Sequence, residues 1–317
     1  MFKLRRFHNT DPPHLAEIWR SQPPQRGLMQ PMSAGLLEHC VFSRQYFDPE
    51  GLIVATRDET PVGFAHAGFG PHDDGAQLDR DLGATQLVML RTDGSYPRLA
   101  DELLRASEQY LRSRGAKVLY GGGISPINPF YLGLYGGSEL PGVLDSDTGQ
   151  RELFLRNNYA DTGRVVVLQR ELARFRTFMS RTQRQLRREL LVEYDPAPTP
   201  PDWFEACQFA GTDQVDFTLT RRRDSAVLAS VRFWDIEPLA SSWGIRTAGM
   251  HDLYVEPGFR REGLGSYLLA EAFKEVQRRG IAMIEAHTMA DNEAALAFYK
   301  KLGFTQVDGG TVLRRQA

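Results

Sequence analysis

Hydrophobic positions in residues 1–172 recur in two spacings, alternate positions typical of strands and positions three or four apart typical of helices. They predict strands at residues 4–7, 51–56, 62–70, 86–90, 117–120 and 164–169. They also predict helices at residues 11–20, 33–47, 99–114 and 151–157. The polar segment 57–61, which contains a proline, favours a hairpin between the second and third strands.

The second part of the chain repeats this order of elements. Its pattern predicts strands at residues 190–194, 217–220, 226–234, 250–255 and 281–287. A helix before Gly280 is indicated by apolar residues at helical spacing, namely Leu268, Leu269, Ala272, Phe273 and Val276. A final helix, with Asp291 as its expected N-cap, has an apolar stripe of Ala295, Phe298 and Leu302. Residues 203–209 favour a short helix and residues 235–247 a loop.

Two anchors relate the parts to each other. Segment 112–115 aligns with 277–280, whereas segment 154–159 aligns with 299–304. The offset in residue number between the aligned segments is smaller for the second pair than for the first. The first copy must therefore contain extra residues between its two aligned segments, which predicts an insertion there. Residues 129–147, rich in glycine and aromatic residues, are the candidate. The chain is therefore expected to be an α+β protein of two tandem domains, each with a mixed sheet flanked by helices.

Composition narrows the class of protein. The chain has 317 residues, 42% hydrophobic and 25% charged, which is typical of a globular protein with room for two domains. Its net charge of −2 gives no general attraction to nucleic acid or to an anionic membrane. No apolar run has the length of a membrane span, and the basic start lacks a signal-peptide core, so we expect a cytoplasmic protein. Its two cysteines are expected to fill cores.

The most informative segment joins the strand at 250–255 to the helix before Gly280. It contains the turn Arg260-Arg261-Glu262-Gly263-Leu264-Gly265. A strand that enters a helix through glycines leaves backbone N–H groups unpaired at the positive end of the helix dipole, where they can bind phosphate. On its own this turn is also compatible with an ordinary strand-to-helix connection.

A second motif follows one strand later. It contains Asn292, Ala295, Tyr299, Gly303 and Phe304 on the final helix, and Asn292 and Tyr299 share one face of that helix. The two motifs, in this order, resemble the GNAT superfamily of N-acetyltransferases, whose pyrophosphate turn is Arg/Gln-x-x-Gly-x-Gly/Ala. The resemblance implies two tandem GNAT-like domains.

The resemblance also indicates which of the two copies is expected to be catalytically active. When 112–115 is aligned with 277–280, the turn falls on 95–100, which lacks both glycines and contains a proline. Under the second anchor Tyr299 falls on Phe154, which has no hydroxyl group. We therefore expect residues 1–172 to be a degenerate GNAT-like domain and residues 192–317 to be the catalytic one. Residues 173–191 between them, rich in arginine, are expected to form a basic connecting helix packed between the domains. Recognition of nucleic acid or of an acidic partner is the alternative for this helix.

Attack on a thioester requires a neutral amine, and removing a proton from an alkyl ammonium at pH 7 costs about 4.6 kcal/mol. A base is therefore needed. On the strand 250–255, His251 is expected to share a face with Leu253 and Val255, and the resemblance implies that its position carries the base in some GNAT enzymes. Asp252 is the second candidate and Glu285 the third. A purely structural histidine is an equal alternative.

The remaining site residues are implied by the resemblance. Main-chain groups of Leu253, Tyr254 and Val255 are expected to bind the pantetheine arm of acetyl-CoA, and the side chain of Asn292 to touch it. Arg260 belongs to the pyrophosphate turn, whose backbone N–H groups are those of Arg261, Glu262, Gly263, Leu264, Gly265 and Ser266. Tyr299 is expected to protonate the departing thiolate, with a core tyrosine as the alternative. No metal is expected.

The sequence thus predicts an N-acyltransferase that moves an acetyl group from acetyl-CoA to a primary amine of a small molecule by direct attack. Trp234, Asp235, Glu237 and Trp243 are candidates for contact with the acceptor, because carboxylates suit an ammonium group, although a packed surface loop explains them equally well. A non-catalytic acyl-CoA-binding or partner-binding module is the alternative function. No nucleic acid or membrane partner is expected, and the pattern does not specify the acceptor or the oligomeric state.

Overall fold

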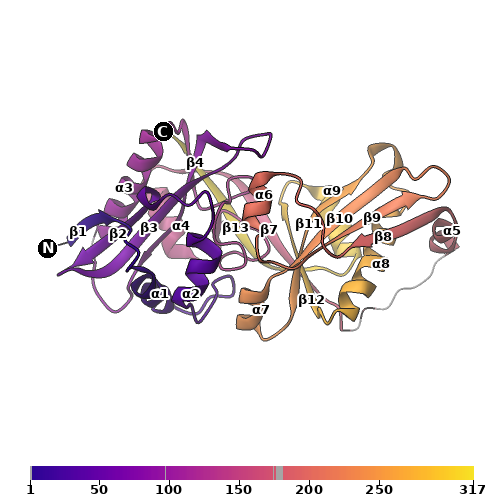
Figure 1. The fold of residues 1–317 in the computed structure, drawn as a ribbon, viewed down its shortest axis with the longest axis horizontal. Helices are drawn as coiled ribbons and strands as arrows, with labels where there is room; N and C mark the ends of the chain where they lie inside the picture. Colours follow the sequence, from indigo (N-terminus) through magenta and orange to yellow (C-terminus); the bar gives the residue numbers. More distant parts are fainter. Residues whose placement is uncertain (1, 97, 174, 176–180) are drawn as a thin grey trace.

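One mixed β-sheet runs through the described part of the chain, residues 2–96, 98–173, 175 and 181–317 of a computed structural model (Figure 1). Thirteen strands of the described residues belong to it. The N-terminal half contributes β1 (Phe2–Arg6), β2 (Leu52–Arg57), β3 (Thr60–Pro71), β4 (Leu78–Leu90), β5 (Val118–Gly121), β6 (Val143–Leu144) and β7 (Ala160–Glu171). The C-terminal half contributes β8 (Leu190–Asp195), β9 (Gln214–Arg221), β10 (Val227–Asp235), β11 (Thr247–Val255), β12 (Met283–Met289) and β13 (Thr305–Gln316).

The last strand of each half pairs with the other half. Across the sheet the order is β1-β2-β3-β4-β5-β13-β7-β12-β11-β10-β9-β8, and β6 pairs with β13. Figure 1 shows β13 crossing to the N-terminal half, where the chain ends. The predicted α+β class with mixed sheets is confirmed. The predicted domain limits, residues 1–172 and 192–317, were drawn along the sequence and stay a prediction. In the sheet, β7 and β13 each pair with strands of the opposite half.

Strand register bears out the internal repeat. The parallel pair β11–β12 begins with Thr247 opposite Met283, and the parallel pair β4–β5 begins with Leu82 opposite Val118. The first anchor aligns Leu82 with Thr247 and Val118 with Met283. The residues that open the two parallel pairs are therefore equivalent in the two copies. The insertion of the first copy lies between β5 and the helix that begins at Thr148.

Helices cover both faces of the sheet. They are α1 (Pro12–Arg20), α2 (Ala34–Leu37), α3 (Leu99–Ser113), α4 (Thr148–Arg156), α5 (Arg181–Glu189), α6 (Trp203–Gln208), α7 (Glu237–Trp243), α8 (Leu264–Arg278) and α9 (Glu293–Lys301). Short helical turns lie at η1 (Glu38–Phe42), η2 (Pro49–Gly51) and η3 (Pro257–Phe259). No helix in the described ranges is both long and apolar enough to pass through a bilayer.

The predicted helix at residues 33–47 is wrong in its extent. Ser33 caps α2 by accepting a hydrogen bond from the Leu36 N–H group, but α2 soon gives way to the π-helical turn η1. The rings of Phe42 and Phe47 both pack against Phe7, with centroids 5.0 and 5.5 Å away. Residues five apart on a regular α-helix point about 140° apart, so both rings reach Phe7 only because the helix ends.

Two other expectations are corrected. Residues 235–247 contain helix α7 rather than a loop, and its pattern is weak because only Leu239 and Ala240 are buried. The basic helix α5 lies at the outer edge of the C-terminal half beside β8, not between the halves (Figure 1). The part of the predicted helix at 174 and 176–180 lies outside the described residues, and Arg184, Arg187 and Arg188 are exposed to solvent.

A hydrophobic core joins the halves. Side chains of α6 and α7 pack with those of α1, β2 and β3, and the insertion at 129–147 contributes several large residues to the same core: Phe130, Tyr131, Leu134, Tyr135 and Leu140. Cys207 is buried there as a free thiol, and Cys40 packs against the core. Burial of this apolar surface holds the two halves in a fixed arrangement.

Candidate functional site

The strands β11 and β12 part in the middle of the C-terminal half. They pair in parallel only from Thr247 to Met250 on β11, opposite Met283 to Ala286 on β12. Beyond this point β11 continues to Val255 with β10 as its strand partner, and β12 continues beside β7. One side of the β11 main chain is therefore open towards the gap, except that the Val255 carbonyl accepts a hydrogen bond from Arg260 Nε at 3.0 Å.

The glycine turn lies at the same end of β11. Gly263 has φ +86°, a left-handed conformation that glycine adopts without strain, and it precedes α8. Among the described residues, the backbone N–H groups from Arg261 to Ser266 have no acceptor. Arg261 and Glu262 are exposed, and a Cβ atom built at Gly263 would meet open space. The turn thus presents unpaired donors at the positive end of a helix of 15 residues.

The second motif faces this turn. Gly265 lies close to Phe298 of α9, since a Cβ atom added to it would be 3.4 Å from that ring. Asn292, rather than Asp291, is the N-cap of α9, because its Oδ1 atom accepts a hydrogen bond from the Ala295 N–H group at 3.1 Å. The amide NH2 group of Asn292 has no partner among the described residues and is exposed.

Tyr299 lies on the buried face of α9. Its ring packs against Phe298 and Phe304, with centroids 5.9 and 5.2 Å away. Its hydroxyl group has no hydrogen-bond partner among the described residues. Burial, followed by the charge of Glu139, raises the pKa of Tyr299 to about 12, so the phenol stays protonated at neutral pH.

His251 and Asp252 form a pair at a β-bulge. The register between β10 and β11 shifts between Ser230 and Arg232. Arg232 lies opposite His251, and Asp252 adopts φ +53°. The His251 Nδ1 atom lies 2.9 Å from Asp252 Oδ2. A carboxylate can only accept, so Nδ1 carries the proton and Nε2 of the neutral ring keeps its lone pair. His251 Nε2 is buried without a partner among the described residues.

The bulge corrects the predicted facing of His251. Leu253 and Val255 pack against the core beneath α8 together with Met250, whereas the ring of His251 stacks on Phe209 at 5.2 Å, on the opposite side of the sheet. The extra residue in β11 breaks the alternation on which the prediction rested. Asp252 is exposed, and its hydrogen bond with His251 lowers the pKa of its carboxyl group.

Glu285 is fully buried beside this pair, on β12. Its carboxylate accepts hydrogen bonds from Arg26 at 2.9 Å, Gln169 at 2.7 Å and the Ser138 N–H group at 2.7 Å. Burial alone raises the pKa of Glu285, but the hydrogen bonds and charges of His287 and Arg26 outweigh it and lower the pKa to about 2. Glu285 therefore stays ionised and holds elements of both halves together.

Replacing Glu285 with glutamine is expected to lower the free energy of unfolding by about 3 kcal/mol at pH 7, because the half-buried Arg26 guanidinium loses its fully buried counter-charge. The folded-state pKa of Glu285 is depressed, so its contribution is present above pH 4 to 5 and is lost as the pH falls towards 2. Denaturant unfolding at pH 7 and at pH 4 measures the difference. A difference that failed to shrink at the lower pH would contradict this role.

The insertion of the N-terminal half lies over this part of β11 and β12. Gly137 adopts φ +135° against the Glu285 carboxylate, and a Cβ atom on it would clash there. Ser138 packs against Gly249 of β11, where a Cβ atom would lie 2.5 Å from the Ser138 Cβ atom. The half-buried Glu139 comes next. The pattern of the sequence predicted the insertion but not its place beside His251.

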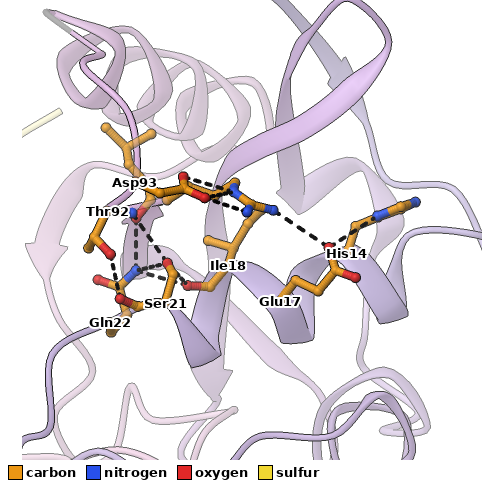
Figure 2. A network of polar contacts seen from close by, with 9 residues as sticks. His14, Glu17, Ile18, Ser21, Gln22, Thr92 and Asp93 are labelled. Atoms are coloured by element: carbon orange, nitrogen blue, oxygen red, sulfur yellow. Dashed lines mark hydrogen bonds and ion pairs between the residues drawn. The ribbon is translucent and has the colours of Figure 1, made fainter.

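The equivalent region of the N-terminal half is already filled. The alignment of β4 with β11 places Val88 and Leu90 where Leu253 and Val255 lie. The Val88 N–H group donates to Gln150 Oε1, and the Leu90 carbonyl accepts from Gln22 Nε2, both at 2.8 Å. Figure 2 shows that the segment after β4 is also tied to α1, since Thr92 bonds to Ser21 there. Side chains of the same half therefore occupy these main-chain groups.

Three of the predicted acceptor residues line a cavity of about 440 Å³ between the halves. Trp234, Asp235 and Glu237 form one side of it, and Phe209 separates it from His251. Asp235 also pairs with Arg246 at 2.9 Å. Trp243 lies elsewhere: its ring covers the Arg26 guanidinium at 4.7 Å. In the described part of the chain, no group of three or more His, Cys, Asp or Glu side chains is arranged to hold a metal ion.

Comparisons with known proteins agree with this geometry. Residues 183–304 match the family model described as Acetyltransferase (GNAT) family. Over these residues the chain is therefore similar to a GNAT domain. The matched residues include the open gap between β11 and β12, the glycine turn and α9. GNAT enzymes in general use acetyl-CoA as the acyl donor.

Curated proteins match shorter stretches of the chain. The [ribosomal protein bS18]-alanine N-acetyltransferase of Escherichia coli K12 is 37% identical over 59 residues, which are 19% of this chain and 40% of that enzyme. Mycothiol acetyltransferase of Catenulispora acidiphila is 27% identical over 151 residues, 37% of this chain and 48% of that enzyme. The matches span less than half the length of these relatives. The tandem layout, with motifs intact only in the C-terminal copy, also resembles mycothiol synthase.

Solved structures show the same fold over the whole chain. A tandem GNAT protein from the clavulanic acid biosynthesis pathway has a TM-score of 0.68 at 12% identity, and the comparison covers 100% of this chain and 98% of that one. The glucosamine N-acetyltransferase region of a fungal multi-domain β-N-acetylglucosaminidase has a TM-score of 0.73 at 16% identity, covering 99% of this chain and 38% of that one. At these identities the likeness shows the tandem GNAT fold alone.

Proposed function

We propose that this protein transfers the acetyl group of acetyl-CoA to a primary amine, and that the reaction takes place in the C-terminal half. The observation that carries the proposal is the row of unpaired N–H groups from Arg261 to Ser266, at the open end of the gap beside β11. These donors suit the pyrophosphate of CoA, and the main chain of Leu253, which has no paired residue on β10, suits the amides of pantetheine. The amide of Asn292 faces the same arm.

The chemistry is assigned to His251 and Tyr299. His251 Nε2, directly or through a water molecule, takes a proton from the amine, and Asp252 holds the ring in the tautomer that leaves Nε2 free. The amine nitrogen then attacks the thioester carbonyl carbon, and the C–S bond breaks. Tyr299 gives its hydroxyl proton to the departing sulfur atom. The raised pKa of Tyr299 supports this role, because the phenol is protonated when the thiolate forms.

A non-catalytic acyl-CoA-binding module is the alternative, and the unpartnered hydroxyl of Tyr299 argues against it. The two functions differ in turnover. We expect the protein to release free CoA from acetyl-CoA when supplied with a panel of primary amines, as followed by a thiol-reactive dye. Binding of CoA without release for every amine would favour the module. The primary-amine acceptor and the cytoplasmic location stay predictions.

Replacing His251 with glutamine is expected to lower kcat/KM about 100-fold, because a positioned base contributes about 10² to 10⁴ to the rate. Binding of CoA should stay unchanged, since the ring lies on the opposite side of the sheet from Leu253 and Val255. His72→Gln, at an exposed histidine of the N-terminal half, is the control. Turnover by His251→Gln at the wild-type rate would rule out His251 as the base.

A further inference from the structure

Several polar atoms around the end of the β11–β12 pairing are buried without a hydrogen-bond partner among the described residues. They come from both halves of the chain: Arg26 Nη1, Ser138 Oγ, Trp234 Nε1, His251 Nε2 and His287 Nδ1. Buried polar groups are nearly always bonded, so a cluster of unpaired ones indicates space for a polar ligand or for water. Two of the residues, Arg26 and Ser138, belong to the degenerate half.

The insertion brings a carboxylate to this cluster. Gly137 and Ser138 are fixed on β11 and β12, because the Ser138 N–H group donates to Glu285 and Ser138 packs against Gly249. Leu140 is buried in the core that joins the halves. Glu139 is therefore held between two anchored residues. Its side chain makes no hydrogen bond or ion pair with any residue in the described ranges.

Charges of the site act on Glu139. Burial raises the pKa of its carboxyl group, the charges of His287 and His251 lower it, and those of Asp252 and Glu285 raise it, with a raised pKa as the result. Glu139 in turn raises the pKa of Tyr299. The carboxylate thus lies within electrostatic range of both groups that carry the proposed chemistry. The other two carboxylates nearby already have partners: Glu285 accepts hydrogen bonds from several groups, and Asp252 pairs with His251. Within the described part of the chain, Glu139 is the one of the three whose oxygens are left to bind an ammonium group.

We propose that Glu139, supplied by the insertion of the N-terminal half, is a catalytic residue of the acetyl-transfer site: it binds the ammonium group of the acceptor and takes the proton that must leave before the nitrogen can attack. The inference rests on the proposed function and names its substrate class. The acceptor is an amine that is cationic at neutral pH, rather than an alcohol or a weakly basic amine.

The number of protons that leave the amine explains why the reaction needs a second proton-accepting residue. An ammonium nitrogen loses two protons on its way to an amide, one before attack and one from the tetrahedral adduct, while the C–N bond forms and the C–S bond breaks. Glu139 takes the first proton, so the proton removal assigned to His251 under the proposed function is divided between the two residues, and His251 takes the second proton. The sulfur atom receives one proton from Tyr299, which is reprotonated from solvent. Glu139 and His251 each pass one proton to solvent, so the net release is one proton for each acetyl group transferred.

The test compares Glu139→Gln with the wild type on an amine that the wild type acetylates. At pH 7 we expect kcat/KM to fall about 100-fold or more, with CoA affinity unchanged by calorimetry. The loss should shrink as the pH rises towards the pKa of the amine, and it should be small for 2,2,2-trifluoroethylamine, which is neutral at pH 7. Glu152→Gln, at an exposed glutamate of α4, is the matched control.

The possible failures are distinguishable. Wild-type turnover by Glu139→Gln at pH 7 would overturn the inference and leave the proposed function standing. A loss that is equal at every pH and for the neutral amine would also overturn it, since that result indicates only a structural role. Glu139→Asp, which keeps the charge, checks this point and should recover part of the rate. Absence of wild-type turnover with every amine would remove the proposed function and this inference together.

Discussion

Replacing Gly263 with aspartate is expected to weaken CoA binding by about 100-fold or more, because a carboxylate would stand among the N–H groups proposed to hold the pyrophosphate. The glycine has φ +86°, and a Cβ atom there meets nothing of the protein within 4 Å. The new side chain would therefore project into the space intended for the ligand. Isothermal titration calorimetry with CoA measures the loss.

The control for this substitution is Gly244→Asp. Gly244 has φ +68° and equally open surroundings, but it lies at the end of α7, away from the turn. It reproduces the backbone strain and the added charge without the phosphate site. Equal CoA affinity for Gly263→Asp and Gly244→Asp would mean that the glycine turn does not bind the pyrophosphate.

Replacing Tyr299 with phenylalanine is expected to reduce kcat about 100-fold, within the range for loss of a positioned general acid. The hydroxyl group has no structural partner among the described residues, so the fold and CoA affinity should be unaffected. Steady-state kinetics, together with the CoA dissociation constant, separates the two effects. The thiolate must then take its proton from water.

Tyr267 provides the control, since it is a buried tyrosine on α8 in the same core. Tyr267→Phe should turn over at the wild-type rate. A Tyr299→Phe variant with unchanged kcat would show that Tyr299 only fills the core, and one with CoA binding lost as well would indicate a binding role instead.

Much of the fold and the cofactor turn could be predicted because the information is local. Glycines before a helix set the conformation of Gly263, and the repeated spacing of hydrophobic positions revealed two copies of one arrangement. Helix α7 was missed because two buried residues are too few to show a period. The N-cap of α9 was misplaced by one residue, because Asp291 and Asn292 are both good capping residues and only the backbone path separates them.

The non-local features could not be predicted in the same way. Exchange of β7 and β13 between the halves depends on strand pairing across the whole chain, which no local pattern records. The bulge at Asp252 turned His251 to the face opposite Leu253, because one extra residue reverses the alternation. Glu139 belongs to the insertion, and a lone carboxylate beside Leu140 gives no sign that it reaches a site on the other half.

The central claim is that CoA binds to the C-terminal half, with its pyrophosphate on the N–H groups from Arg261 to Ser266 and its arm in the gap between β11 and β12. A crystal structure of the protein with CoA tests it most directly. The account predicts density for the cofactor at this turn, with the sulfur atom near Tyr299 and the region between Val88 and Gln150 empty. A cofactor bound instead between β4 and β5 of the N-terminal half would contradict it.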